Sequence, residues 1–274
     1  TYEEALRRVA LVPGQRVLDV GCGVGSFLQL VAERGAQPFG LDASEALIEF
    51  ARRRLPAAEF RVGEMEALPY DDDTFDLVTG FNSFFFADDF VAALREAGRV
   101  AKPGAPVVIQ VWGPHECNDL EAMKEIARPF FPPRPANAPP EPDNSTPGVL
   151  EDIATQAGLA PEQAFDAAWS FEFADDETMT RALIAPAGLA VLVGAEREPE
   201  FKRALIEGLA AFRTSDGATG SRTSTTTRSR EPEEDEDELL RRHPRGRARL
   251  DGRTRDDGAA WRRRPRGVHE RARR

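Results

Sequence analysis

The sequence predicts an α/β fold built on a doubly wound, mostly parallel sheet, with a lid insertion after the fifth strand. Between residues 15 and 112, short apolar runs rich in β-branched residues alternate with helical segments. Strands separated by helices usually pair in parallel through βαβ units. The strand runs are apolar throughout rather than alternating, which is expected where helices cover both faces of a sheet.

Five strands and three connecting helices make up this region. The expected strands are Arg16–Val20, Pro38–Leu41, Glu59–Val62, Phe75–Gly80 and Pro106–Val111. The helices carry apolar residues at helical spacing and are expected at Ser26–Glu33, Glu45–Arg54 and Phe90–Val100. Ser44 is expected to cap the second helix, because its hydroxyl oxygen can accept an N–H of the first turn.

The pattern changes after the fifth strand. Residues 129–147 contain eight prolines, which predicts an irregular insertion rather than a helix. We expect residues 113–148 to form a lid over the carboxyl ends of the strands, where ligands bind in such sheets. Its apolar residues, Trp112, Met123, Phe130 and Phe131, fit a small organic substrate. Beyond it we expect helices near 147–157, 177–185 and 199–212, and a sixth strand at 168–173.

Charge divides the chain into two parts. The net charge of −11 over 274 residues argues against a general nucleic-acid or anionic-membrane binder. Residues 1–213 carry 19 basic and 35 acidic residues (19 − 35 = −16), whereas residues 214–274 carry 17 and 12 (17 − 12 = +5). We therefore expect one domain at 1–213, with core 15–112, lid 113–148 and C-terminal part 149–213. Residues 214–274 are too poor in apolar residues to fold and are expected to be a disordered, Arg-rich tail.

A glycine loop follows the first strand, at Gly21-Cys22-Gly23-Val24-Gly25. Glycines there let the backbone approach a ligand closely, and the next helix offers free N–H groups. A dinucleotide-binding loop would have glycine where Ser26 stands and usually an apolar residue where Asp19 stands, so an NAD-dependent dehydrogenase is the weaker hypothesis. No Lys-Ser/Thr pair follows the glycines, which excludes a Walker loop.

Two aspartates indicate the kind of ligand. A carboxylate at Asp19 would repel a pyrophosphate but suits an ammonium group, and S-adenosylmethionine carries an ammonium group and no phosphate. Asp42 ends the second strand 21 residues after Gly21, the distance at which an acidic residue reaches ribose hydroxyls. The alternative for Asp42 is a helix N-cap or a surface acid.

The order and spacing of these motifs resemble those of class I S-adenosylmethionine-dependent methyltransferases. The most similar subgroup is type 11, which methylates small molecules and includes quinone-precursor C-methyltransferases and natural-product tailoring enzymes. The resemblance covers residues 15–112 and rests on Asp19 with the glycine loop, and on residues 41–44, 63–70, 71–78 and 101–105.

The resemblance implies a role for each matching residue. Asp19, Gly21, Cys22, Gly23 and Gly25 would hold the methionine part of the cofactor S-adenosylmethionine. The ribose would lie against Asp42, and the adenine against Ala43, Glu64 and Met65. The sulfonium would lie against Phe81 and Asn82. The family usually has Asp where Glu64 stands, and Cys22 fits a packing residue better than a nucleophile.

Methyl transfer needs alignment more than acid–base chemistry. The transfer is an in-line displacement, and a base helps only when the acceptor must lose a proton early. His115 and Asn82 are the candidate catalytic residues, with a solvated loop histidine as the alternative for the former. Phe81, Phe84, Phe85 and Phe86 fit either the site or ordinary core packing. No His, Cys, Asp and Glu cluster has metal-ligand spacing, so no metal is expected.

We therefore expect a cytoplasmic methyltransferase whose partner is a small-molecule methyl acceptor, with no nucleic-acid or membrane partner. The Asn-Pro-Pro-aromatic signature of nucleic-acid and protein amide N-methyltransferases is absent after the fourth strand. The alternative is a non-catalytic cofactor-fold module that binds RNA through its basic tail.

The tail itself has three explanations: an RNA-binding arm, a solubilising tail, or an out-of-frame translation product. The family's sheet ends with an antiparallel seventh strand between the fifth and sixth strands, yet no strand is expected after Phe212. Residues 218–227 can be encoded so that the next frame reads Gly-Tyr-Arg-Leu-Glu-Asn-Glu-Tyr-His-Tyr, a plausible strand. We therefore expect the last strand to be missing, which would leave an unpaired sheet interior.

The out-of-frame hypothesis predicts that one base is lost near the Gly217 codon. Resequencing this stretch of DNA from the source should reveal the extra base and the restored strand sequence. An intact reading frame across residues 214–230 would contradict the hypothesis.

Overall fold

The computed structural model describes residues 1–113, 121–131, 144–184, 193–212, 219–226 and 261–263. The chain divides into two compact units. The first contains residues 1–111, 144–167 and 226–274, and the second contains residues 112–143 and 168–225. The boundaries of the two units differ from the expected subdivision. The second unit combines most of the expected lid, residues 113–148, with most of the expected C-terminal part, residues 149–213.

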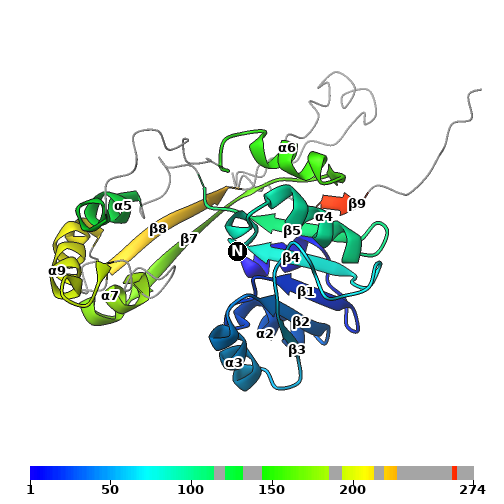
Figure 1. Ribbon diagram of the computed structural model, residues 1–274, viewed down its shortest axis with the longest axis horizontal. Helices are drawn as coiled ribbons and strands as arrows, with labels where there is room; N and C mark the ends of the chain where they lie inside the picture. The colour runs from blue at the N-terminus through cyan, green and yellow to red at the C-terminus, as the bar shows by residue number, and fades with distance from the viewer. Residues whose placement is uncertain (114–120, 132–143, 185–192, 213–218, 227–260, 264–274) are drawn as a thin grey trace, which may run out of the picture. The chain divides into compact units, whose positions relative to one another are not determined.

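The first unit is built on a seven-stranded sheet in the order β3-β2-β1-β4-β5-β9-β6 (Figure 1). Its strands are β1 Arg16–Val20, β2 Gln37–Asp42, β3 Glu59–Val62, β4 Leu77–Phe81, β5 Pro106–Gln110, β6 Leu159–Pro161 and β9 Trp261–Arg263. The strands from β1 to β5 pair in parallel, and β9 runs antiparallel between β5 and β6. The strand order reverses between β1 and β4, and ligands bind at such switch points in doubly wound sheets.

Helices cover both faces of this sheet, as expected. They are α1 Tyr2–Arg8, α2 Ser26–Glu33, α3 Glu45–Arg54, α4 Phe90–Val100 and α6 Val149–Gln156, with a 3₁₀ turn η1 at Phe84–Phe86. The bounds predicted for α2, α3 and α4 are confirmed. Ser44 caps α3, because its Oγ accepts the N–H of Leu47 at 3.4 Å. The sequence did not predict α1.

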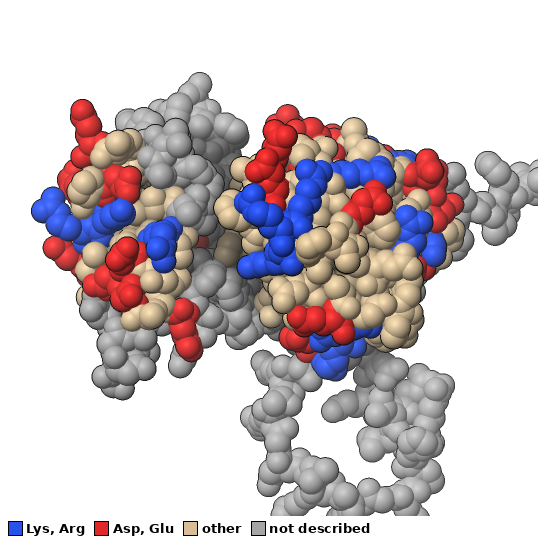
Figure 2. Space-filling view, turned by 90° about the horizontal axis from the view of Figure 1, so that it is seen from below, with Lys and Arg blue, Asp and Glu red and all other residues tan. Residues whose placement is uncertain are grey.

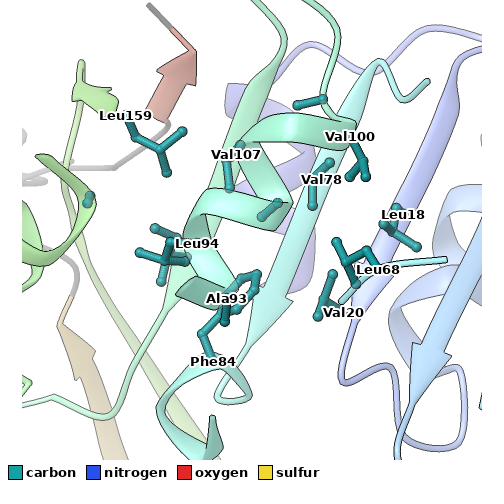
Figure 3. Close-up of a cluster of buried hydrophobic side chains, with 14 of the residues drawn as sticks. Leu18, Val20, Leu68, Val78, Phe84, Ala93, Leu94, Val100, Val107 and Leu159 are labelled. Atoms are coloured by element: carbon teal, nitrogen blue, oxygen red, sulfur yellow. The ribbon is translucent and has the colours of Figure 1, made fainter. Parts of the chain in front are cut away.

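The core forms two apolar layers, one on each face of the sheet. On one face, Ala93, Leu94 and Val100 of α4 pack against Val78 and Val107 (Figure 3). On the other face, α1, α2 and α3 contribute Leu6, Phe27, Leu28, Val31 and Ile48, which pack with Val17 and Val108 of the sheet. Since both faces are buried, the strands carry apolar side chains in both directions.

The last strands differ from the expectation. The sixth strand is β6 at 159–161 rather than 168–173, and β9 at 261–263 occupies the place between β5 and β6. The expectations of a missing last strand and of an unpaired sheet interior are therefore wrong. Both strands are only three residues long, so pairing partners distant in sequence define them rather than a local pattern.

The second unit contains a two-stranded sheet of β7 Asp166–Phe173 and β8 Thr219–Thr226, with β7 crossing the boundary between the units. Strands β8 and β9 lie within residues 214–274, so this segment is not disordered throughout. The other residues of the segment lie outside the described ranges, and the disorder expected for them stays a prediction. The helical elements are α5 Glu121–Ala127, η3 Arg128–Phe130, α7 Asp176–Ile184, α9 Glu198–Gly208 and η5 Ala210–Phe212.

Three of the four apolar residues expected to line a lid, Met123, Phe130 and Phe131, pack within the core of the second unit instead, whereas Trp112 is partly buried and is not part of that cluster. Phe130 is buried, and its ring lies 4.8 Å from that of Phe201. Met123 and Phe131 are partly buried against the same cluster. These side chains stabilise the second unit, and its function as a lid stays a prediction.

The packing of α4 on the sheet predicts a large effect of truncating Leu94. This side chain is fully buried, so Leu94→Ala should lower the free energy of unfolding by about 2–5 kcal/mol through lost burial and a residual cavity. Leu47→Ala, on the exposed side of α3, is the control and should lower it by less than about 1 kcal/mol. Urea denaturation measures both, and equal effects would contradict the packing described here.

Candidate functional site

The candidate site begins with a buried carboxylate on β1. Asp19 is 3% exposed, and its Oδ1 accepts a hydrogen bond from the Thr79 hydroxyl on β4 at 2.7 Å. Burial raises the pKa of Asp19 to about 7; the Thr79 hydrogen bond lowers it, and the charge of Asp42 raises it further. Asp19 therefore retains acceptor capacity for a positively charged or hydrogen-bonding ligand group.

The glycine loop turns tightly against the end of β2. The N–H groups of Gly21 and Cys22 both donate to the carbonyl oxygen of Leu41, at 2.8 and 3.0 Å. Two features require glycine at position 21. Its φ is 71°, which favours glycine, and a Cβ there would lie 2.3 Å from the Cβ of Ser83. Gly23 also has a positive φ, 53°, but no atom lies within 4 Å of where its Cβ would be. The backbone at Gly23 thus faces open space into which a ligand can approach.

Asp42 connects the glycine loop to the start of α3. Its Oδ2 accepts the N–H of Gly23 at 2.8 Å, and its Oδ1 accepts the N–H of Ser44 at 2.9 Å. Its backbone carbonyl accepts the N–H of Gly63 at 3.1 Å, which holds the segment after β3 alongside. Each carboxylate oxygen accepts one of these bonds and has a second lone pair for a ligand hydroxyl.

The structure brings the predicted adenine-side residues to the same end of the sheet. The register pairs Asp42 with Val62, so residues 63–65 follow directly beside the end of β2. Ala43 and Glu64 are exposed, whereas Met65 is partly buried against the core. The three residues are therefore adjacent to Asp42, as the sequence predicted, and their contact with a ligand stays a proposal.

An aromatic cluster covers the end of β4. The ring of Phe81 lies 4.7 Å from the rings of both Tyr2 and Phe27. Burial and the charge of Asp19 raise the pKa of Tyr2 to about 12, so α1 places this ring near the candidate site. Sequence reasoning missed Tyr2, although Tyr2, Ala5 and Leu6 have the apolar spacing of a short helix.

The three phenylalanines after β4 divide between the alternatives that the sequence left open. Phe84 is buried in the core that α4 covers. Phe85 is partly buried against the same core, and Phe86 is 68% exposed. Core packing is therefore confirmed for Phe84 and contradicted for Phe86.

Two side-chain amides at the ends of β4 and β5 lack partners. Asn82 has a positive φ of 52°, and its N–H donates to the carbonyl oxygen of Gln110 at 3.0 Å. The side-chain oxygens of both residues, Asn82 Oδ1 and Gln110 Oε1, are buried without a hydrogen bond in the described part of the chain. Leaving such a group unsatisfied costs about 1–3 kcal/mol. Sequence reasoning missed Gln110, although a polar residue closing the apolar run Val107–Ile109 is a recognisable signal.

The remaining candidates are Cys22 and His115. Cys22 is buried, and desolvation together with the charges of Asp19 and Asp42 raises the pKa of its thiol. A thiol held protonated in this way is a packing residue rather than a nucleophile. His115 lies outside the described residues. Within the described ranges, no group of His, Cys, Asp and Glu residues could hold a metal ion.

Comparison with known proteins identifies the family. The family model of the methyltransferase domain matches residues 18–109, which contain Asp19, the glycine loop and Asp42. An uncharacterised protein of Mycobacterium tuberculosis, Rv1405c, is 30% identical over 220 residues, which cover 75% of this chain and 77% of that protein. The chain belongs to the class I S-adenosylmethionine-dependent methyltransferases. The cofactor of this family is S-adenosylmethionine.

Two relatives of this chain carry names that state an activity. The demethylmenaquinone methyltransferase of Renibacterium salmoninarum is 39% identical over 101 residues, which cover 37% of this chain and 43% of that protein. The malonyl-[acyl-carrier protein] O-methyltransferase of Serratia marcescens is 33% identical over 115 residues, 42% of this chain and 45% of that protein. The chain thus spans less than half the length of these two relatives.

Solved structures share the fold of this chain. YcgJ from Bacillus subtilis matches with a TM-score of 0.55 at 18% identity, covering 82% of this chain and 95% of that one. The [4+2]-cyclase SpnF matches with a TM-score of 0.50 at 19% identity, covering 82% and 79%. At this level of identity the likeness concerns the fold alone, and activity must be argued from the site.

The geometry also fits the family's cofactor. Open space at Gly23 permits close approach, Asp42 has lone pairs for hydroxyls, and Asp19 is a buried acid suited to an ammonium group. None of the described residues in this site would repel an uncharged adenosine or a sulfonium.

The raised pKa of Asp19 makes a prediction about stability in the absence of ligand. The folded chain holds this proton up to about pH 7, whereas the unfolded chain releases it near its ordinary pKa of 3.8. Between these values the unfolded chain binds fewer protons, so the free energy of unfolding falls as pH rises, by up to about 4 kcal/mol.

Asp19→Asn should remove this contribution while keeping an acceptor for Thr79. Urea denaturation of both proteins at pH 4 and pH 7.5 measures it, and the variant should gain stability relative to the wild type at the higher pH. Parallel pH profiles of the two proteins would contradict the raised pKa.

Proposed function

We propose that this chain binds S-adenosylmethionine at the carboxyl ends of β1, β2 and β4 and transfers its methyl group to a small organic acceptor. The observation that carries this proposal is the bridge made by Asp42, which holds the glycine loop beside open space at Gly23. A carboxylate in this place both shapes the loop and offers acceptors to a ribose. The family membership of the chain supports the same reading.

Each side chain at this edge has a proposed role in binding. Asp42 accepts hydrogen bonds from the ribose hydroxyls, and Ala43, Glu64 and Met65 line the adenine. Asp19 accepts from the ammonium group, directly or through water, together with the backbone of the Gly21–Gly25 loop. Tyr2 joins the predicted residues here, because its partly buried ring packs against Phe81 and lies close enough for the charge of Asp19 to raise its pKa.

When bound, S-adenosylmethionine supplies an activated methyl group on a sulfonium, which is a good leaving group. The protein therefore needs mainly to align the acceptor with the methyl carbon and to exclude water. The aromatic cluster of Phe81, Tyr2 and Phe27 offers ring faces that stabilise a neighbouring cation. Asn82 stands next to Phe81 and positions the acceptor, and His115 remains a candidate base for acceptors that must lose a proton.

A small-molecule acceptor is favoured over a nucleic acid by the charge of the surface. On the face that Figure 2 shows, Asp and Glu side chains border the Lys and Arg side chains, and the whole chain carries a net charge of −11. Ion pairs such as Arg7–Glu4 and Arg99–Asp72 neutralise several of the arginines. The names of the two relatives give demethylmenaquinone and malonyl-[acyl-carrier protein] as their methyl acceptors, and neither is a nucleic acid.

Among the helices that the structure describes, none combines the length and the apolar character that a membrane crossing requires.

Binding of S-adenosylhomocysteine tests the proposed cofactor site. By calorimetry, Asp42→Ala and Gly23→Val should each weaken binding at least about tenfold, because one removes a charged acceptor and the other fills the open space. Asp152→Ala on the exposed side of α6 and Gly104→Val are the matched controls. Gly104 shares the positive φ and open surroundings of Gly23, so its variant introduces the same strain away from the site.

Wild-type protein that binds no S-adenosylhomocysteine, or variants that match their controls, would overturn the proposed site. A labelled-methyl assay with phenols, amines and quinone precursors then tests transfer. Tight binding without transfer to any acceptor would indicate that the fold serves another chemistry, as the name of SpnF shows for that protein.

A further inference from the structure

The two unpartnered amides, Asn82 and Gln110, are the strongest unexplained feature of the molecule. Gln110 is the last residue of β5 and is 7% exposed, yet its Oε1 has no hydrogen bond in the described residues. Asn82 lies one residue past the end of β4, and its Oδ1 is likewise a buried atom without a hydrogen bond in the described residues. A hydrogen bond from the Asn82 N–H to the Gln110 carbonyl holds the two backbones together.

Two other buried polar atoms in the described ranges lack partners, Arg16 Nε and Tyr70 Oη, but they belong to an aromatic cluster. The Arg16 guanidinium lies 4.8 Å from the ring centre of Phe39 and 5.4 Å from that of Phe75. The ring of Tyr70 lies 5.0 Å from that of Phe75. The aromatic faces under the Arg16 cation compensate for its missing hydrogen bond, whereas the edge-on contact between the rings of Tyr70 and Phe75 leaves the Tyr70 hydroxyl without one in the described residues. The amides at the ends of β4 and β5 have no such compensation.

The sheet register places Gln110 among groups that suit a cation. Phe81 and Gln110 are paired across β4 and β5, so their side chains share the face that α1 and α2 cover. Thr79 lies two residues before Phe81 on β4, so its side chain points to the same face. Asp19 is paired with Thr79 across β1 and β4 and therefore lies on this face as well. The Gln110 amide is therefore next to the aromatic cluster of Phe81, Tyr2 and Phe27, near a buried carboxylate. Aromatic faces and unpaired carbonyl-type oxygens together favour a group rich in N–H donors.

We propose that Gln110 and Asn82 form a pair of hydrogen-bond acceptors that holds the nucleophilic nitrogen of the methyl acceptor, which makes a primary or secondary amine the substrate class. This inference rests on the proposed methyl transfer. It adds Gln110 as a specificity-determining residue. Its occupant is a hydrogen-bond donor because the unpartnered atoms of both amides are oxygens, and the neighbouring aromatic cluster favours an amine over a hydroxyl.

The chemistry of transfer agrees with an amine. The nitrogen lone pair forms the new N–C bond while the C–S bond of the sulfonium breaks and its electron pair stays on sulfur. The nitrogen then carries the positive charge and loses a proton to water. Amide oxygens are too weakly basic to remove a proton beforehand, and a neutral amine does not require it. As charge develops on nitrogen its N–H groups become stronger donors, so both hydrogen bonds strengthen in the transition state.

A series of amines with decreasing numbers of N–H groups tests the proposal with the full chain. The probes are benzylamine, N-methylbenzylamine and N,N-dimethylbenzylamine, assayed with labelled S-adenosylmethionine. For the wild type, kcat/KM should be highest for benzylamine and should fall at least about tenfold for the amine without an N–H.

Gln110→Met keeps the length of the side chain and removes the acceptor. This variant should lose about 10- to 100-fold in kcat/KM for benzylamine and no longer distinguish the three amines. Its affinity for S-adenosylhomocysteine should stay within about twofold of the wild type. Its melting temperature without ligand should rise by roughly 2–4 °C, because an unsatisfied buried oxygen is gone. Gln110→Glu retains acceptor oxygens and should keep most of the amine turnover, and Gln29→Met on the exposed side of α2 should change nothing.

Three results would overturn this proposal. The first is a lower melting temperature for Gln110→Met, which would make Gln110 a structural residue. The second is a parallel loss of S-adenosylhomocysteine affinity, which would assign the amide to the cofactor. The third is turnover of phenols or quinone precursors but of no amine, unchanged in Gln110→Met; the proposed methyl transfer would then stand and only the amine class would fall. Absence of S-adenosylhomocysteine binding in the wild type would instead overturn the proposed function on which this inference rests.

Discussion

The candidate site depends on the two hydrogen bonds that the Asp42 carboxylate accepts from the backbone. The carboxylate accepts one N–H from the glycine loop and one from the turn before α3, so a single side chain fixes the loop after β1 relative to the end of β2. Within this loop, Gly23 has a positive φ and faces open space. A neutral residue at position 42 would leave two N–H groups without this acceptor. The shape of the loop and the acceptors for a ligand hydroxyl thus come from the same two oxygens.

The buried polar groups show how the fold separates stability from ligand binding. Far from the glycine loop, the Arg99 guanidinium donates to the carbonyl oxygens of Leu68 and Tyr70 and to the carboxylate of Glu96, so its hydrogen-bonding capacity is well used. At the ligand-binding edge, Asn82 and Gln110 keep buried oxygens without donors. An apolar residue at either place would stabilise the empty protein, which is the usual opposition between stability and a binding site.

The sequence predicted those parts of the fold that local patterns determine. The helices α2, α3 and α4 have the predicted bounds, because apolar spacing and the Ser44 cap are local signals. The Asp19–glycine loop–Asp42 arrangement was predictable for a similar reason, since residue type and spacing reflect the ligand. By contrast, β6 and β9 are too short for a periodic pattern and are defined by pairing with β5 and each other. Gln110 has a local signal, a polar residue that closes an apolar run, but the missing partner of its side-chain oxygen is visible only once β4, β5 and the helices on that face are assembled.

A crystal structure of the chain with S-adenosylhomocysteine tests the central claim most directly. Our account predicts that both ribose hydroxyls lie within hydrogen-bonding distance of the Asp42 carboxylate, about 2.5–3.0 Å between oxygens, with the ligand passing over Gly23. The account also predicts that Asp42 keeps its bonds to the N–H groups of Gly23 and Ser44. A ligand bound elsewhere, or an Asp42 carboxylate that contacts only the protein backbone while the ribose is held by other residues, would contradict it.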